Sequence, residues 1–376
     1  MAELKIASVR TQRFDIALGS PIRMAFGEVR VRNFVLVRIR DADGVEGVGE
    51  TGALGGPYWG QESAESIEAA INNYIAPLLV GRTIGGLNGL AAWLCTTIRG
   101  NEAARNGVEM AALDLIAKRS DQRAADVLGG SCRDRLPVAW TLSTGSVETD
   151  IEDGERAIAE RGHRRFKLKF TRERAEADVA RAIAIIEAFR GRANVIVDVN
   201  QAWDEVIAAR YLPILAEAGL EAIEQPMPAA EIDKAASFKV GLPFHMIADE
   251  GIAGPTAMLR LAAKSAASAV SLKPNRDGGP SATRQVAAIA LAAGMELYGG
   301  TMLETTLGTA ASAHVYSAMP RLGLGTELFG PFRLSDDIAV ARLPIQDGMI
   351  DLPARPGWGV TLDEDKIEFL VRQRGH

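Results

Sequence analysis

The 376-residue sequence is poor in the residues that build disulfide frameworks and histidine metal sites: it has two cysteines and four histidines. Cys95 and Cys132 lack the close spacing of metal ligands, so we predict two buried, reduced thiols. No apolar run reaches about 18 residues, and the first residues lack the apolar core of a signal peptide. We therefore expect a cytoplasmic protein that does not interact with a membrane.

An excess of positive charge is also missing. Lysine and arginine number 42 against 48 acidic residues, which gives a formal net charge of −6. This balance argues against a nucleic-acid surface. Hydrophobic residues make up 47% and charged residues 24%, a composition typical of globular proteins. The length allows two domains or one large, decorated domain.

The first third of the chain predicts a compact α+β unit over residues 1–132. Apolar and polar residues alternate through about the first 50 residues, as in 32–50, and the Asp-Ala-Asp-Gly step inside this stretch indicates a β-hairpin. A glycine-rich loop follows at 51–63. Helical periodicity then predicts a helix with Ile67, Ile71, Tyr74 and Leu78 on one buried stripe, and a second helix over 103–118.

From residue 133 to 335 short apolar runs alternate with amphipathic helices, which is typical of βαβ units and a parallel sheet. The runs occupy 136–142, 165–170, 194–200, 221–226, 244–250, 269–274, 295–302 and 323–330. Eight such strands fit a closed (β/α) barrel of the TIM type better than an open sheet. The last segment, 336–376, is expected to fold back on the N-terminal unit.

Acidic residues recur where the predicted strands end. In a barrel of this kind the C-terminal ends of the strands converge on one site. Asp198, Glu224 and Asp249 end three consecutive strands. One such aspartate alone is most often a helix cap or a turn former. Three together form a set of hard oxygen ligands, which favours Mg²⁺ or Mn²⁺ over Zn²⁺ and permits stabilisation of an enolate next to a carboxylate.

Basic residues occupy the strands on either side of these carboxylates. Lys167 and Lys169 lie two apart in one strand, so they point to the same face, and Lys273 ends a strand about halfway around the barrel. An exposed edge pair is the alternative for the two neighbouring lysines. Inside a barrel, Lys167 is expected to disfavour a second positive charge and so make Lys169 a usable acid/base.

These motifs together resemble the enolase superfamily, and within it the muconate-lactonizing subgroup. The similarity extends over essentially the whole chain. It is carried by Lys167-Leu168-Lys169, Asp198-Val199-Asn200, Glu224-Gln225-Pro226, Asp249-Glu250, Lys273, the Thr-Glu-Leu-Phe-Gly-Pro stretch at 326–331 and the helix at 103–118. The resemblance implies a modified TIM-type barrel covered by an N-terminal α+β capping domain, and it implies a homo-oligomer, often an octamer.

The resemblance also assigns roles. It implies that Asp198, Glu224 and Asp249 bind Mg²⁺ or Mn²⁺, supported by Asn200 and Glu250, and that loops around Ile22 and from Leu54 to Trp59 close over the barrel and set specificity. Lys169, aided by Lys167, is the expected proton donor, and Lys273 is expected to stabilise charge on the opposite face. Glu327 is expected to position the substrate or tune Lys273.

The implied reaction is the conversion of cis,cis-muconate, or a close dicarboxylate, to a muconolactone through a metal-stabilised enolate. Two alternatives stay open: a racemase, epimerase or dehydratase of an N-acylamino acid, proline betaine or hydroxyproline on the same two-lysine site, and a barrel that only binds. The segment Pro274–Asp277 differs from the less polar stretch usual in this subgroup.

Histidine chemistry is not expected. The racemase branch that uses a His–Asp pair requires a histidine after the seventh strand, and residues 298–301 contain none. We predict that His245 and His314 are packing or surface residues and that His163 and His376 are exposed.

Overall fold

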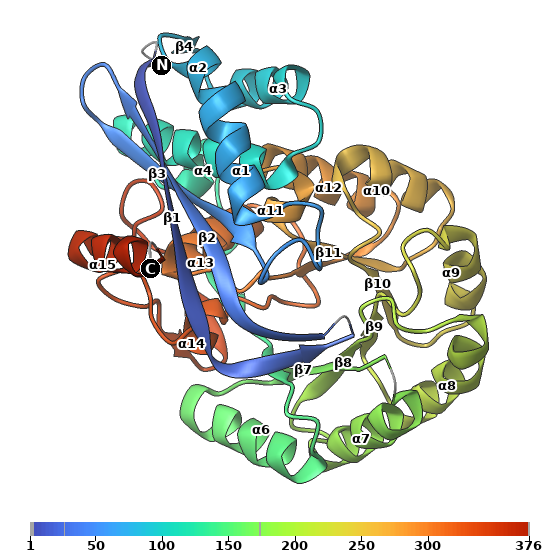
Figure 1. Ribbon diagram of the computed structural model, residues 1–376. Helices are drawn as coiled ribbons and strands as arrows, with labels where there is room; N and C mark the ends of the chain where they lie inside the picture. The colour runs from blue at the N-terminus through green and yellow to red at the C-terminus, as the bar shows by residue number, and fades with distance from the viewer. Residues whose placement is uncertain (1–3, 26, 173, 375–376) are drawn as a thin grey trace.

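The computed structural model describes residues 4–25, 27–172 and 174–374. It consists of an antiparallel sheet with helices, formed by the first third of the chain, that lies against a curled parallel sheet ringed by helices (Figure 1). The antiparallel sheet has the order β3-β2-β1-β4. Its strands are β1 (Leu4–Met24), β2 (Gly27–Asp41), β3 (Glu46–Ala53) and β4 (Thr83–Ile84).

The capping helices pack closely on this sheet because glycines leave space for them. They are α1 (Ala64–Ala70), the π-helix η1 (Ile71–Ile75), α2 (Ala76–Leu79), α3 (Leu87–Thr97), α4 (Glu102–Arg119) and α5 (Ala124–Val127). A Cβ on Gly49 of β3 would lie 2.4 Å from the backbone oxygen of Gly107 in α4. Any side chain there would force the helix away from the strand.

The π-helix corrects the predicted apolar stripe. Ile67 and Ile71 are buried as expected, but Tyr74 and Leu78 are 65% and 57% exposed. The buried side chains of the next turns include Ile75 and Leu79. A π-turn inserts one extra residue, so the buried face moves by one position after Ile71.

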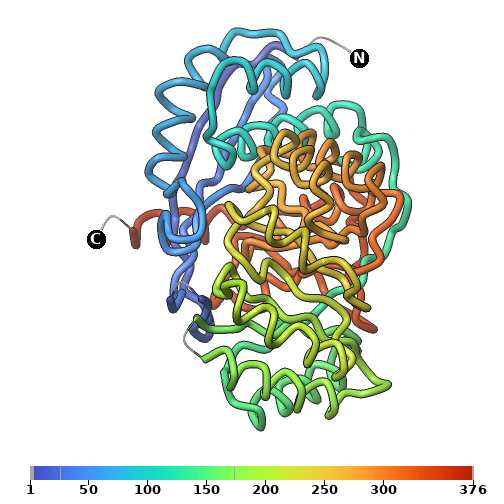
Figure 2. Tube along the Cα trace, turned by 90° about the vertical axis from the view of Figure 1, so that its right-hand side faces the viewer, coloured from blue at the N-terminus to red at the C-terminus, as the bar shows by residue number. Residues whose placement is uncertain are grey.

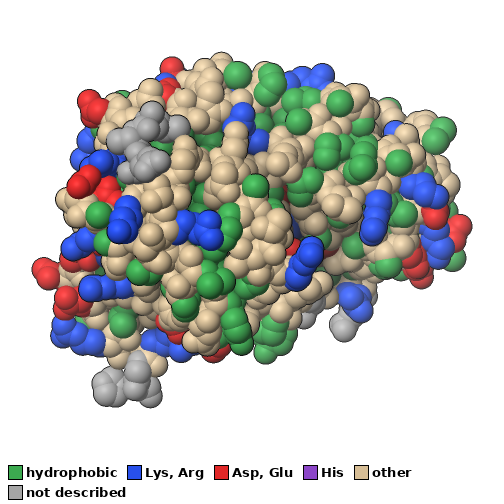
Figure 3. Space-filling model, turned by 90° about the horizontal axis from the view of Figure 1, so that it is seen from above, with side chains coloured by type: hydrophobic (Ala, Val, Ile, Leu, Met, Phe, Trp, Pro, Cys, Tyr) green, Lys and Arg blue, Asp and Glu red, His purple; other side chains and the backbone are tan. Residues whose placement is uncertain are grey.

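Seen from above, hydrophobic side chains on the outer surface lie among charged ones (Figure 3).

The second part is a parallel sheet with the strand order β12-β11-β10-β9-β8-β7-β6. The strands are β6 (Trp140–Leu142), β7 (Arg165–Lys169), β8 (Asn194–Asp198), β9 (Ala222–Glu224), β10 (His245–Ala248), β11 (Ala269–Leu272) and β12 (Glu296–Gly299). The helices are α6 (Val147–Arg161), α7 (Ala175–Ala188), α8 (Glu205–Ala218), α9 (Ile232–Lys239), α10 (Gly254–Ala263), α11 (Pro274–Asp277), α12 (Pro280–Ala292), α13 (Thr306–Ser317) and α14 (Gly330–Arg333). This arrangement confirms the predicted barrel-type α/β fold.

The eighth predicted strand, at 323–330, is reduced to a bridging residue. Thr326 forms isolated parallel bridges to Val138 on one side and to Gly299 of β12 on the other. These bridges join the two edges of the sheet. A regular strand does not form because Gly325 has φ +73°, which takes the backbone out of the extended region.

The first predicted barrel strand, 136–142, is split in two. Its first half, β5 (Arg135–Pro137), pairs with the C-terminal hairpin β13 (Ile345–Gln346) and β14 (Met349–Asp351) in a separate three-stranded sheet. The chain ends in α15 (Glu364–Arg374), which packs against β1 of the capping sheet. The C-terminal segment therefore contacts both parts, and it runs beside the capping sheet in the side view (Figure 2). The proposed boundaries at 132 and 335 remain a prediction.

Several predictions about single side chains are wrong. Cys95 and Cys132 are both exposed. His163 is fully buried. Its Nδ1 lies 2.8 Å from the backbone oxygen of Val138, and this hydrogen bond reduces the cost of burying the ring. His314 is buried as a packing residue, as expected, and His376 lies outside the described residues. Within the described ranges, no helix has the length and apolar character needed to cross a membrane.

Candidate active site

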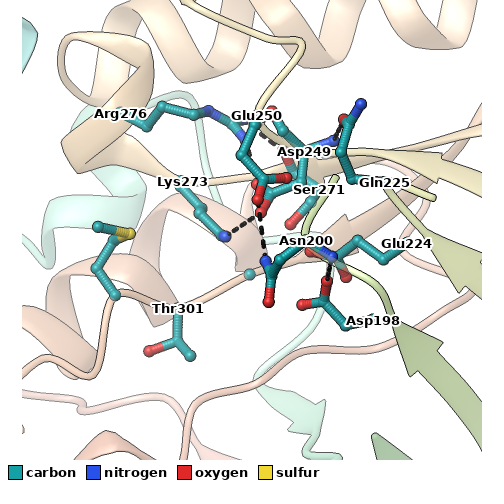
Figure 4. Close-up of polar contacts among 12 residues, drawn as sticks. Asp198, Asn200, Glu224, Gln225, Asp249, Glu250, Ser271, Lys273, Arg276 and Thr301 are labelled. Carbon is teal, nitrogen blue, oxygen red and sulfur yellow. Dashed lines mark hydrogen bonds and ion pairs between the residues drawn. The ribbon is translucent and has the colours of Figure 1, made fainter. Parts of the chain in front are cut away.

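The register of the parallel strands brings the predicted site residues to one level. Lys169 in β7 is the lateral neighbour of Asp198 in β8, which in turn neighbours Glu224 in β9. Residues in register on adjacent strands point to the same face. Asp249 and Lys273 directly follow β10 and β11, so the same end of the sheet carries all of them. Figure 4 shows Asp198, Glu224, Asp249 and Lys273 side by side.

Ammonium groups bind the three carboxylates directly. Lys167 Nζ lies 3.0 Å from Asp198 Oδ2 and 2.8 Å from Glu224 Oε2. Lys169 Nζ donates to Asp198 Oδ2 at 2.6 Å, and Lys273 Nζ donates to Asp249 Oδ2 at 2.6 Å. Asp198, Glu224 and Asp249 are fully buried.

These contacts decide which groups are charged. Burial opposes ionisation of Asp198, but Lys167 and Lys169 outweigh it and hold its pKa below the usual range. Burial, reinforced by Asp198 and Asp249, raises the pKa of Glu224 well above its ordinary value. Glu224 is therefore the one carboxylate of the three that lacks sufficient positive charge.

The carboxylate oxygens of Asp198, Glu224 and Asp249 are the kind of ligand that a divalent cation prefers, but in this structure they are spaced more widely than the ligands of a bound metal ion. Among the described residues, no group of three or more acidic, histidine or cysteine side chains is close enough to hold a metal ion. Within the described part of the chain, neither carboxylate oxygen of Glu224 has a hydrogen-bond partner. Lys167 Nζ lies close to Oε2 as an ion pair but does not form a hydrogen bond with it. A buried carboxylate with one ion pair and no hydrogen bond keeps lone pairs that a divalent cation could use. Asp198, Glu224 and Asp249 are the residues that would hold one.

Polar side chains next to the three carboxylates form hydrogen bonds that fix the positions of the site residues. Asn200 donates from its backbone to Asp198 Oδ1 (3.1 Å) and from Nδ2 to Glu250 Oε1 (2.9 Å). Its φ of +43° is a conformation that asparagine tolerates better than most residues. Gln225 Oε1 accepts from the backbone nitrogen of Asp249 at 2.9 Å. Burial and the nearby Asp249 and Asp198 raise the pKa of Glu250 to about 7.

Lys167 faces into the barrel, as expected, and it contacts Glu327. Lys167 is 1% exposed, and it donates to Glu327 Oε2 at 2.9 Å in addition to its two other carboxylate contacts. Glu327 was expected to position the substrate or tune Lys273; its ion pair is with Lys167, and both expected roles remain predictions. Thr326 bridges both Val138 and Gly299, so Glu327 lies where the two edges of the sheet meet, within reach of Lys167. The catalytic effect of Lys167 on Lys169 remains a prediction.

The capping loop lies over the lysine at the opposite side. Trp59 presents its ring to Lys273 Nζ at 4.6 Å from the centroid, a cation–π contact. The loop and the barrel enclose a cleft of about 260 Å³, lined by Leu54 and Trp59 from the cap and by Glu250 and Arg276 from the barrel. Leu54 itself is buried.

Two side chains fasten this loop to the barrel. Asn275 accepts from Thr51 Oγ1 at 2.6 Å and from the backbone nitrogen of Gly52 at 3.3 Å, and it donates to the oxygen of Gly52 at 3.1 Å. The buried Arg32 donates to the backbone oxygens of Ala53 and Met302. The entrance to the site is therefore built from both parts of the chain.

Sequence reasoning did not assign a role to Arg276, Gln225 or Gly300. A Cβ on Gly300 would lie 2.6 Å from Cε of Lys273, so glycine leaves room for the lysine side chain. Arg276 was noted only as part of an unusual stretch. The useful signal was its acidic neighbour Asp277 and its position three residues after Lys273.

Comparison with known proteins agrees with this geometry. Residues 6–129 match the family model described as "Mandelate racemase / muconate lactonizing enzyme, N-terminal domain", and residues 150–366 match "Enolase C-terminal domain-like". The chain is 40% identical to a chloromuconate cycloisomerase from Cupriavidus necator, covering 98% of this chain and 100% of the relative. It is 42% identical to muconate cycloisomerase 1-2 from Acinetobacter lwoffii, covering 98% and 96%.

A solved structure resembles the fold throughout. Muconate lactonizing enzyme from Pseudomonas fluorescens, complexed with muconolactone, superposes with a TM-score of 0.95 at 40% identity, covering 98% of this chain and 99% of that one. Both halves of the molecule thus match one family along nearly their full length. The chain belongs to the mandelate racemase/muconate lactonizing enzyme family, in the muconate-lactonizing subgroup of the enolase superfamily.

Proposed function

We propose that the protein is a divalent-metal-dependent cycloisomerase that converts cis,cis-muconate, or a close dicarboxylate such as a chlorinated muconate, to a muconolactone. The observation that carries this proposal is the placement of Lys169 and Lys273 four strands apart, with three buried carboxylates on and after the strands between them. Proton chemistry beside a substrate carboxylate requires an acid/base on one face and stabilised charge on the other.

Each residue has a distinct task. Lys169, hydrogen-bonded to Asp198, reaches the substrate from one face and delivers the proton to the carbon next to the carboxylate. Lys273, held under the ring of Trp59, keeps its charge near the developing negative charge on the other face. A divalent cation at Asp198, Glu224 and Asp249 supplies Lewis-acid stabilisation of the substrate carboxylate when it is bound.

A second carboxylate on the substrate is supported by positive charge near Lys169. Arg23 of the capping hairpin, Arg174 and Lys169 line one cavity of about 180 Å³. Cationic side chains gathered in this way favour a dianion over a zwitterion. The relatives named as chloromuconate and muconate cycloisomerases support the same substrate class.

The test is lactone formation from muconate, followed as loss of the conjugated-diene absorbance, in matched samples with Mn²⁺ and with a chelator. We expect turnover with Mn²⁺, none with the chelator, and none for Asp198→Asn. Comparison of kcat/KM for muconate and chloromuconate then ranks the substrates. The proposal is wrong if muconate is inert while an N-acylamino acid or a proline derivative exchanges its α-hydrogen with solvent deuterium.

We further propose that the cation is Mg²⁺ or Mn²⁺, that the protein is a homo-oligomer, an octamer by analogy with the family, and that it acts in the cytoplasm. The all-oxygen donor set supports the choice of cation. Light scattering after size-exclusion chromatography measures the assembly, and a monomeric mass contradicts it.

A further inference from the structure

Arg276 is fixed by hydrogen bonds on every side. Its side chain, only 7% exposed, reaches from α11 to Asp249 (Figure 4). Nη1 donates to Asp249 Oδ1 at 2.5 Å and to the backbone oxygen of Asp249 at 2.8 Å. Nη2 donates to the oxygen of Ser271 and to Asp277 Oδ1, each at 2.6 Å, and Nε donates to Asp277 Oδ1 at 2.9 Å. These contacts use all the N–H donors of a guanidinium group.

This arrangement divides the two oxygens of Asp249. Oδ1 is held by Arg276, whereas Oδ2 faces the interior of the site and accepts from Lys273 Nζ at 2.6 Å. Both oxygens therefore accept a charged donor, and Oδ2, on the side of Lys273, is the one that Arg276 leaves unbound for a cation. Mg²⁺ prefers octahedral coordination, in which a carboxylate commonly contributes one oxygen, while Ca²⁺ takes more ligands and readily accepts bidentate carboxylates.

We propose that Arg276 is a positioning residue that holds Asp249 as a one-oxygen ligand, and so sets both the affinity of the site for a divalent cation and its preference for Mg²⁺ or Mn²⁺ over Ca²⁺. The inference rests on the metal site of the proposed function. Removal of a group that orients a metal ligand typically weakens binding about 10- to 100-fold.

Arginine is needed for this task. Lysine has the same charge, but its donors share one nitrogen atom, so it cannot reach Asp249, Ser271 and Asp277 at once. A positive charge beside a cation site also repels the cation, which opposes the positioning effect. Lysine and methionine substitutions separate the positioning effect from the repulsion. Arg276→Lys keeps the positive charge and loses the several hydrogen bonds of the guanidinium group, whereas Arg276→Met loses both the charge and the hydrogen bonds.

A matched control exists at the opposite end of the barrel. Arg165 begins β7 and binds Glu221 through two hydrogen bonds of 2.6 Å each. Arg165→Lys therefore makes the same chemical change in a half-buried arginine–carboxylate pair away from the site. Any general effect of such a substitution on the barrel appears in this variant as well.

The experiment measures cation binding on the full-length protein stripped with a chelator. Electron paramagnetic resonance of free Mn²⁺ gives its Kd, and competition gives the Kd for Ca²⁺. We expect Arg276→Lys and Arg276→Met both to weaken Mn²⁺ binding about 10- to 100-fold. Both should also lower the ratio of the Ca²⁺ Kd to the Mn²⁺ Kd, and Arg165→Lys should change neither quantity.

Three outcomes count against the inference or its basis. Tighter Mn²⁺ binding by Arg276→Met with unchanged binding by Arg276→Lys would show that repulsion dominates, and wild-type values in both variants would show that Arg276 has no role. Failure of the wild-type protein to bind Mn²⁺ would instead refute the proposed metal site. If both variants fail to fold, Asp277→Asn provides the test: it loosens the arginine without removing it, and we expect weaker Mn²⁺ binding, while unchanged binding overturns the inference.

Discussion

Replacing Lys167 with methionine tests how the buried charges of the site are balanced. Its ammonium group is 1% exposed and lies within 3.0 Å of Asp198, Glu224 and Glu327. Methionine fills a similar volume without the charge. The substitution leaves three buried carboxylates short of one cation, and removing one partner of a buried ion pair typically costs about 3–5 kcal/mol. We expect the free energy of unfolding in chelator to fall by this amount.

The chain offers a matched control for this prediction. Lys169 is more exposed, at 11%, and among the described residues it forms one ion pair, with Asp198, and a longer hydrogen bond of 3.4 Å to Asn200 Oδ1. Loss of one hydrogen bond between charged groups costs about 1.5–3 kcal/mol, so Lys169→Met should be the less destabilised variant. Both lysines sit on the same strand, which keeps the backbone environment constant.

Urea unfolding at one fixed protein concentration, in chelator and in excess Mn²⁺, measures these differences. Mn²⁺ at 100 times its Kd stabilises a folded protein by about 2.7 kcal/mol. Because the unpaired carboxylates of Lys167→Met attract a cation more strongly, its deficit should narrow in Mn²⁺. Equal stability of Lys167→Met and the wild-type protein in chelator would refute the reasoning.

Three further predictions concern the cap and a buried histidine. Trp59→Leu removes a partly desolvated cation–π contact with Lys273, worth about 1–2 kcal/mol, and should reduce kcat/KM for muconate about tenfold; a value equal to wild type would contradict this. Asn275→Ala frees the loop at Gly52, and hydrogen exchange of residues 52–60 should accelerate, whereas unchanged protection would show another anchor. Burial lowers the pKa of His314 from 6.5 to about 4, so the unfolded chain binds the proton first. The contribution of His314 to the free energy of unfolding is therefore complete above pH 6.5, and up to about 3 kcal/mol of it is lost as the pH falls to 4. Urea unfolding at each pH should show a smaller loss of unfolding free energy in acid for His314→Gln than for the wild-type protein. An equal loss in both would assign it to other groups.

The placement of the charged groups could be predicted because it depends on local rules. Alternation within a strand puts Lys167 and Lys169 on one face, and the repetition of strand and helix puts Asp198, Glu224 and Asp249 at one end of a sheet. The structure places these residues at that end of the sheet. Their roles as ligands and acids remain predictions.

Other features depend on contacts between distant segments. The exposed Tyr74 follows from a π-turn that periodicity does not reveal, and the buried His163 follows from a carbonyl oxygen 25 residues earlier in the chain. Glu327 pairs with Lys167 rather than Lys273 because the barrel closes through single bridges at Thr326. None of these outcomes is encoded in a short stretch of residues.

By itself, the sequence determined the barrel, its cover and the identity of the charged residues at the strand ends, since strand and helix periods are local properties of a chain. Only the tertiary structure decided which charge meets which, such as Arg276 with one oxygen of Asp249 and Trp59 with Lys273. Such pairings depend on distances of a few ångströms between segments that packing, rather than local pattern, brings together.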